Sequence, residues 1–143
     1  MEDIGLLFVE PTGHEHHGLT VVKIHGGEFD GAEYAVASTE DEASKAALSA
    51  AEDSLWAFNS EFIGSFLGLS DTQTKAIAEM QGRLCEDAQE IVRLLLGARC
   101  AEFVESAVDT DGRGHFLSPY DGEETDGEDV SPALGGKTVF RLD

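Results

Sequence analysis

Helical periodicity is clearest between Ser70 and Val108, where the chain reads SDTQTKAIAEMQGRLCEDAQEIVRLLLGARCAEFVESAV. Ser70 and Gln73 fit a capping box, a pattern that starts a helix. Apolar residues then recur at alternating steps of three and four, which predicts a helix with one buried seam. The seam consists of Ile77, Met80, Leu84, Ala88, Ile91 and Leu95. We expect this helix to be the structural spine, to break at Gly97 and to be followed by a second helical segment.

Short apolar or β-branched runs bounded by glycine predict β-strands in the first 38 residues and near the end of the chain. The predicted strands lie at about residues 4–9, 19–24, 33–37, 115–118 and 137–142. The first three are joined by short glycine-rich links, which favour an antiparallel arrangement.

Four helices are predicted at about residues 40–58, 60–68, 71–96 and 98–108, with an acidic loop at about 121–130. Alanines give the first helix a shallow apolar face that can lie close against a sheet. Residues 55–67 hold the only tryptophan and three phenylalanines, which predict a dense core; a patch for a partner or a second copy is the alternative. The predicted fold is α+β, a small antiparallel β-sheet packed against three to four α-helices in one domain, residues 1–143.

The charge balance is the outlying feature of the composition, with 29 acidic against 9 basic residues and a formal net charge of -20. Such a chain repels nucleic acid and anionic membranes and attracts cations and basic protein surfaces. Direct binding to DNA or RNA is therefore excluded as a function class. Residues 109–143 contain nine acids and are the most acidic quarter of the chain.

The termini and the two cysteines predict a cytoplasmic protein. The N-terminus is acidic where a signal peptide would be basic, and no apolar run approaches membrane-spanning length. Cys85 and Cys100 lack the C-x-x-C spacing of a zinc or redox site. On one straight helix they would lie about 22 Å apart, too far for a disulfide, which favours free thiols in a reducing compartment.

The segment between residues 13 and 18 contains three of the five histidines, His14, His16 and His17. Imidazoles at this density are weak candidates for zinc, nickel or copper ligands. The segment lacks the helical i,i+4 spacing of H-E-x-x-H, and a solvated loop is the alternative. No cofactor is expected.

The residues after Val108 partly match two patterns, one of a calcium-binding loop and one of a catalytic site. Asp109 and Asp111 resemble the first positions of an EF-hand calcium loop, but Arg113 occupies the fifth ligand position, which a calcium shell does not accept. His115 beside Asp111 and Arg113 is the one constellation that suggests catalysis, and no nucleophile stands at a defined spacing from it. A non-enzymatic protein is therefore expected.

Exposed carboxylates near the C-terminus are the predicted partner-binding residues, because they can occupy a groove lined with lysine and arginine. They are Asp109, Asp111, Asp121, Glu123, Glu124, Asp126, Glu128 and Asp129.

The segment DGRGHFLSPYDGEE, residues 111–124, together with the final Phe140-Arg141-Leu142, resembles the tail of small uncharacterised acidic proteins encoded by phages and other mobile elements. LWAFN at residues 55–59 belongs to the same pattern, so the resemblance covers roughly residues 33–143. It implies a context in which small acidic proteins often inhibit host defence machinery. It transfers no functional residue.

Charge and resemblance together predict an acidic interaction protein that inhibits a basic, nucleic-acid-handling host protein, such as a defence nuclease or CRISPR effector, by charge-complementary binding or DNA mimicry. It would act in the host cytoplasm, away from membranes, and a homodimer is an open alternative to a monomer. The alternative is a salt-adapted regulatory or dimerisation module, which the four lysines among 29 acids also suit.

Overall fold

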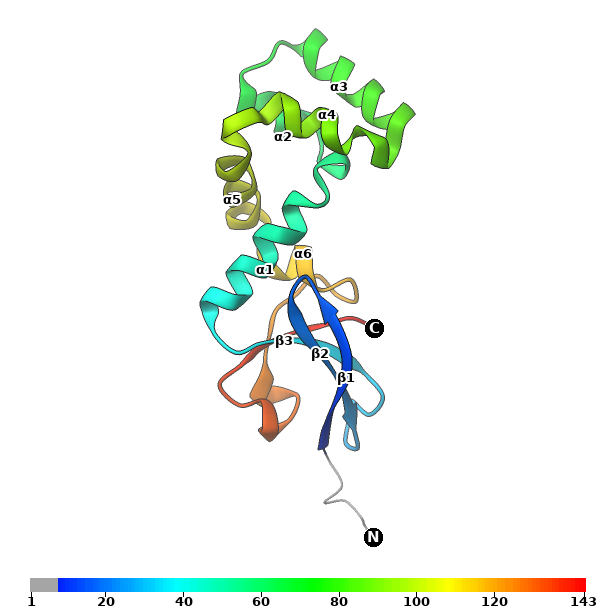
Figure 1. Ribbon diagram of the computed structural model, residues 1–143, viewed down its shortest axis with the longest axis vertical. Helices are drawn as coiled ribbons and strands as arrows, with labels where there is room; N and C mark the ends of the chain where they lie inside the picture. Colours follow the sequence, from blue (N-terminus) through cyan, green and yellow to red (C-terminus); the bar gives the residue numbers. More distant parts are fainter. Residues whose placement is uncertain (1–7) are drawn as a thin grey trace. The chain divides into compact units, whose positions relative to one another are not determined.

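A computed structural model describes residues 8–143 and confirms the predicted α+β fold with an antiparallel sheet (Figure 1). The chain forms two compact units, which are described separately. Unit 1 comprises Met1–Ala50 and Val108–Asp143, and unit 2 comprises Ala51–Ala107. The first four residues of the strand predicted at 4–9 lie outside the described residues.

Unit 1 contains a five-stranded sheet in the order β1-β2-β3-β5-β4, in which each neighbouring pair is antiparallel. The strands are β1 (Phe8–His16), β2 (Leu19–His25), β3 (Glu33–Ala37), β4 (Thr125–Asp126) and β5 (Thr138–Arg141). The β1–β2 hairpin turns on His17 and Gly18, whose φ angles of 50° and 85° match a type I′ turn. The predicted histidine loop is therefore the end of β1 and a tight turn.

The sheet is covered on both faces, as the buried pattern of β3 indicates. On one face, Ala35 and Ala37 pack with buried alanines of α1 (Glu40–Glu52). These are Ala43, Ala46, Ala47 and Ala50. On the other face, Tyr34 and Val36 pack with Val130 and Leu134 from the segment before β5. Alanine on alanine lets the helix lie close to the sheet, as the sequence predicted.

The strand predicted at 115–118 is wrong, because these residues belong to a short helix, α6 (Arg113–Leu117). Gly112, with φ of 88°, separates α6 from α5 (Cys100–Asp111). The turn points Leu117 into the core of unit 1, where it is fully buried. Burial of Leu117 favours the helical conformation of this five-residue segment, which has no periodicity of its own.

The acidic segment at 121–130 is only partly a loop. It contains β4, which pairs with β5, and the 3-10 turn η5 (Gly127–Asp129). Gly114 of α6 lies so close to this segment that a Cβ there would be 2.4 Å from the carbonyl carbon of Glu123. Close approach of the two backbones fixes the start of the acidic segment.

Unit 2 is helical. Its helices are α2 (Ser60–Leu67), α3 (Asp71–Leu84), α4 (Gln89–Leu96) and the first part of α5, with 3-10 turns η2 (Leu55–Ala57), η3 (Cys85–Ala88) and η4 (Gly97–Arg99). Two of these helices begin at side-chain caps, Asn59 for α2 and Ser70 for α3. The capping box of Ser70 and Gln73 is confirmed, with hydrogen bonds of 2.9 and 3.2 Å. The helix predicted at 40–58 ends earlier, at Glu52, and is followed by η2.

Aromatic side chains form the centre of unit 2. Phe103 is fully buried, and the ring centroids of Phe58, Phe62 and Phe66 lie 5.0 to 5.2 Å from its own. Ring pairs at this spacing and tilt contribute packing energy beyond the burial of their area. No helix among the described residues is both long and apolar enough to cross a membrane.

The continuous helix predicted at 71–96, with its single seam, is wrong. Cys85 adopts φ of 50° and ψ of -124°, which ends α3, and η3 follows before α4 begins. Ile77 and Ala88 of the predicted seam are buried, but the break shifts the helical phase, so Val92 and Leu96 are buried after it in place of Ile91 and Leu95. Three residues of the predicted seam, Leu84, Ile91 and Leu95, are 38%, 38% and 45% exposed.

Candidate functional site

The candidate site is the acidic edge of unit 1, which we define as the first turn of α1, the end of α5 and residues 121–129. The first turn of α1 adds Glu40, Asp41 and Glu42 to the predicted residues. The eight carboxylates predicted from the sequence are all exposed. Asp109 and Asp111 lie in the last turn of α5, and the other six lie between α6 and the end of η5.

Arg113 is the residue that joins these segments. Its Nε and Nη2 donate to the two carboxylate oxygens of Glu124 at 2.9 and 2.8 Å, and Nη2 also donates to Glu40 Oε1 at 2.8 Å. Its Nη1 lies 3.3 Å from both the Glu40 carbonyl oxygen and Ser44 Oγ. The Arg113 side chain is only 16% exposed, so α6 holds a mostly covered cation between two acidic segments.

The electrostatics follow from this contact. The hydrogen bonds that the Arg113 guanidinium donates to the Glu124 and Glu40 carboxylates, together with the charges of those carboxylates, raise the pKa of Arg113 above its ordinary value. The hydrogen bond and the charge of Arg113, together with a hydrogen bond from Thr138, lower the pKa of Glu40 below 4.5. Glu40 is therefore ionised at neutral pH.

Three of the predicted carboxylates make intramolecular hydrogen bonds that stabilise the local backbone conformation. Besides Glu124, Asp121 Oδ1 accepts hydrogen bonds from Ser118 Oγ at 2.8 Å and from the backbone N–H of Glu123 at 3.0 Å. Asp126 Oδ1 accepts from the N–H of Glu128 at 3.2 Å and caps η5. Such local bonds to the backbone fix turns.

The other predicted carboxylates point to solvent without a hydrogen bond or ion pair from their side chains to the described part of the chain. They are Asp109, Asp111, Glu123, Glu128 and Asp129. Their charges are available to a partner, whereas the structural carboxylates set the path of the backbone that presents them.

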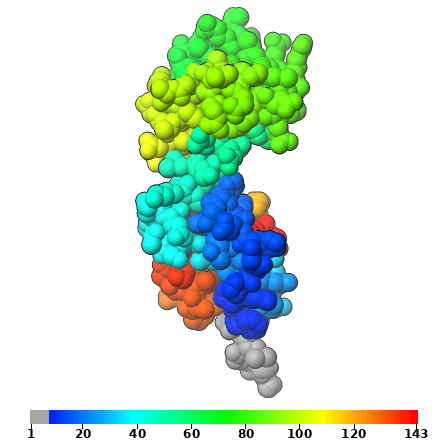
Figure 2. Space-filling view, in the orientation of Figure 1, coloured from blue at the N-terminus to red at the C-terminus, as the bar shows by residue number. Residues whose placement is uncertain are grey.

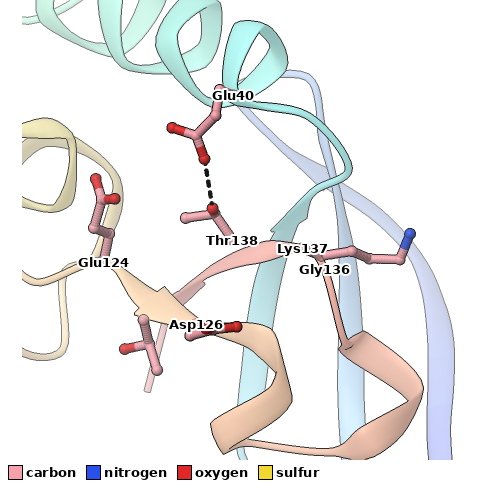
Figure 3. A pocket seen from close by; sticks show the side chains of 7 residues that line it. Glu40, Glu124, Asp126, Gly136, Lys137 and Thr138 are labelled. Carbon is pink, nitrogen blue, oxygen red and sulfur yellow. Dashed lines mark hydrogen bonds between the residues drawn. The ribbon is translucent and has the colours of Figure 1, made fainter.

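An open hollow of about 350 Å³ lies within the acidic edge and is lined by residues of the α1 start and of β4 and β5 (Figure 3). Glu40 Oε2 accepts a hydrogen bond from Thr138 Oγ1 at 3.2 Å across it. Glu124 and Asp126 add two carboxylates, while the side chain of Lys137 extends away from Glu40 (Figure 3). The chemistry of this lining suits an ammonium or guanidinium group.

The three candidate histidines do not converge. His14 is exposed on β1, and His16 Nε2–H donates to the carbonyl oxygen of Leu117 at 2.9 Å. Burial lowers the pKa of His16 below 6.5, and nearby His17 adds to this, while the bond to Leu117 opposes it. Among residues 8–143, no three His, Cys, Asp or Glu side chains are arranged to hold a metal ion.

The structure gives no geometric support to the hypothesis that His115, Asp111 and Arg113 form a catalytic site. His115 is exposed on α6 and makes an edge contact with the ring of Phe116. Arg113, the second member of that constellation, is bound to Glu40 and Glu124.

Comparison of the chain with protein families, curated proteins and solved structures finds no match.

Sequence reasoning missed Glu40 and Arg113 as members of the site. They are 73 residues apart in the chain, and no short motif connects them. The available signal was local: Glu40 opens an acidic helix start, and Arg113 is the one cation between Arg99 and Lys137.

Proposed function

We propose that the protein is a non-enzymatic binding protein whose acidic edge occupies a basic groove on a partner protein. The single observation that supports this most is that Arg113, which follows the end of α5, binds both the α1 start and residues 121–129 and compensates only part of the charge of these three segments. Eleven carboxylates belong to these segments, and the field they produce steers a cationic surface toward them.

The partner class that this chemistry fits is a protein that handles nucleic acid, because its phosphate-binding groove displays lysine and arginine. A defence nuclease or CRISPR effector, which the sequence resemblance suggests, belongs to that class. In this proposal Glu123, Glu128 and Asp129 stand where phosphates would otherwise bind, and the mechanism is competition with nucleic acid.

The test is capture of host proteins on the immobilised full chain, followed by elution with salt or with duplex DNA. A triple variant, Glu123→Gln with Glu128→Gln and Asp129→Asn, removes three exposed charges of the edge. The matched control removes three exposed charges elsewhere, Glu15→Gln, Glu28→Gln and Glu79→Gln.

We expect the wild type and the control to retain a protein that DNA displaces and that about 0.5 M salt releases, and the edge variant to lose it. Capture that is insensitive to salt, or that the edge variant retains, would contradict the proposal. The salt-adapted alternative predicts no DNA-competed capture at all.

A further inference from the structure

The exposed apolar surface of the described chain is concentrated on α4 in unit 2. Six large apolar residues are exposed in the part of the chain that the structure describes, and four of them lie between residues 84 and 95. Of the other two, Phe8 stacks on the ring of His25 with centroids 4.6 Å apart. The guanidinium of Arg141 covers the Tyr120 ring at 4.0 Å. The four residues in unit 2 are therefore the apolar surface that needs an explanation.

Ile91, Leu94 and Leu95 form a continuous face of α4, because residues at i, i+3 and i+4 share one side of a helix. Leu94 is 78% exposed, the highest value among the large apolar residues of the described chain. The segment forms part of the visible surface of unit 2, in yellow-green (Figure 2). We call these three residues the α4 face.

α4 cannot turn this face inward, because its other side is fixed. Val92 and Leu96 are buried in unit 2. Gln89 Nε2 donates to the Glu52 carbonyl oxygen at 2.6 Å, while its Oε1 accepts from the Trp56 N–H at 3.1 Å. These contacts define the orientation of the helix, so the exposure of the α4 face is a property of the fold.

Acidic side chains border the α4 face. Glu90 stands four residues before Leu94 on the same side of α4, and its side chain is 75% exposed. Glu86 and Asp87 lie in η3, the turn before α4, and both are exposed. Neither side chain makes a hydrogen bond or ion pair with the described part of the chain. The nearest base before them in the sequence is Arg83, which belongs to α3.

The next two bases along the chain are already bound to acids. Arg93 Nη1 donates to Glu52 Oε2 at 2.5 Å, while Arg93 Nε lies 3.5 Å from Glu90 Oε2, so one cation is shared by two carboxylates. Arg99 Nε lies 3.4 Å from Glu102 Oε1. The border of the α4 face therefore has an excess of negative charge that unit 2 does not compensate.

We propose that the α4 face binds an amphipathic helix of a partner protein, with apolar side chains on one side and lysine or arginine beside them. The apolar side chains of such a helix pack between Ile91, Leu94 and Leu95 as ridges into grooves. Its cations lie beside Glu90 and the acids of η3, so the two surfaces are complementary in charge. A second copy suits this surface less, because it brings the same acids and a further net charge of -20.

The test is the fluorescence anisotropy of a labelled synthetic peptide of about 18 residues, built from leucine and lysine, with the leucines on one side of a helix. The control for charge alone is a peptide of the same composition whose order forms no apolar side. At about 0.15 M salt, we expect the full chain to bind the amphipathic peptide about tenfold more tightly than the control peptide.

A neutral substitution tests the apolar contact. Leu94→Gln removes the apolar side chain without changing the charge and should weaken binding of the amphipathic peptide about tenfold. Ala78→Gln, which places the same residue at an exposed position of α3, should bind as the wild type does. Far-UV circular dichroism checks that each variant keeps its helices.

Two charge variants separate local attraction from net charge. Glu86→Gln with Asp87→Asn and Glu90→Gln should weaken binding of the amphipathic peptide roughly fivefold, since each exposed ion pair contributes little. The edge variant of the proposed function loses the same number of carboxylates, all in unit 1, and should bind the peptide as the wild type does. The α4 face and the acidic edge are therefore tested independently, and either proposal can fail alone.

Equal binding of the two peptides, or binding that Leu94→Gln leaves unchanged, overturns the proposal. Equal losses in the two charge variants would show that binding follows net charge, which also overturns it. Sedimentation equilibrium of the chain alone tests the other occupant. A wild type that dimerises and a Leu94→Gln variant that does not would assign the α4 face to a second copy and overturn the proposal.

Discussion

Arg113 shows how one residue shapes the acidic edge. Its guanidinium is planar and binds Glu124 through two parallel hydrogen bonds, a geometry that a lysine cannot reproduce. The same group also binds Glu40, at the start of α1. Without this cation the two carboxylates would repel each other, and the start of the acidic segment would lose its tie to the helix.

Arg113→Gln should therefore lower the free energy of unfolding. A partly exposed bidentate pair such as Arg113 with Glu124 contributes about 1 kcal/mol after solvent screening, so we expect a loss of about that size. Urea unfolding measures it. The control is Lys45→Gln, whose exposed pair with Asp41 should be worth less than about 0.5 kcal/mol. Equal losses in the two variants would contradict the role assigned to Arg113.

The same contact predicts a dependence on pH. Because Arg113 lowers the pKa of Glu40 below 4.5, the folded state binds the proton less readily than the unfolded chain. This contribution to stability is fully present above pH 4.5 and is lost as the pH falls through the lowered pKa. Unfolding measured from pH 6 to pH 3 should show a steeper acid loss in the wild type than in Arg113→Gln. Parallel curves would count against the contact.

Two helices of unit 2 end in the same backbone conformation with different residues. Gly97 ends α4 with φ of 56° and ψ of -131°, and Cys85 ends α3 with φ of 50° and ψ of -124°. Each is followed by a 3-10 turn. A glycine adopts this conformation freely, whereas a Cβ makes it costly. The chain therefore carries strain at Cys85 that it avoids at Gly97.

Cys85→Gly should stabilise unit 2. Relief of backbone strain in such a region is worth about 1–3 kcal/mol, and the added freedom of the unfolded chain offsets about 0.4–1 kcal/mol of it. We expect a net gain of about 1 kcal/mol in urea unfolding. Cys85→Ser, which keeps the Cβ and removes the thiol, should be close to neutral. A loss of stability in Cys85→Gly would show that the turn is not strained.

These elements also explain which parts of the fold the sequence could predict. The break at Gly97 was predictable because glycine marks it, and the break at Cys85 was not, since cysteine carries no such signal. The apolar seam was predicted for a helix that continues through Cys85. It therefore placed Ile91 and Leu95 on the buried face, whereas the structure leaves them exposed. Strands β2 and β3 were found correctly from β-branched runs, while α6 depends on the burial of Leu117 against distant residues.

The charge of the whole molecule is unevenly divided between its two units. Residues 1–50 and 108–143 hold 19 acids and 5 bases, whereas residues 51–107 hold 10 acids and 4 bases. Repulsion between like charges is therefore strongest within unit 1, which contains the sheet and the acidic edge. The less charged unit carries the exposed apolar residues Ile91, Leu94 and Leu95. This division concentrates the electrostatic attraction for cations on unit 1.

The response of stability to salt separates the proposed function from the salt-adapted alternative. Apolar side chains are buried on both faces of the sheet and around Phe103, so we expect the chain to stay folded in dilute buffer. Added salt should raise the melting temperature by a few degrees through screening and then level off near about 0.5 M, where the Debye length falls below about 5 Å. A salt-adapted protein would instead be unfolded in dilute buffer and gain stability up to molar salt. Thermal melts followed by circular dichroism across this salt range distinguish the proposed function from the salt-adapted alternative. A plateau in melting temperature supports partner binding as the reason for the acidity. A rise that continues to molar salt contradicts it.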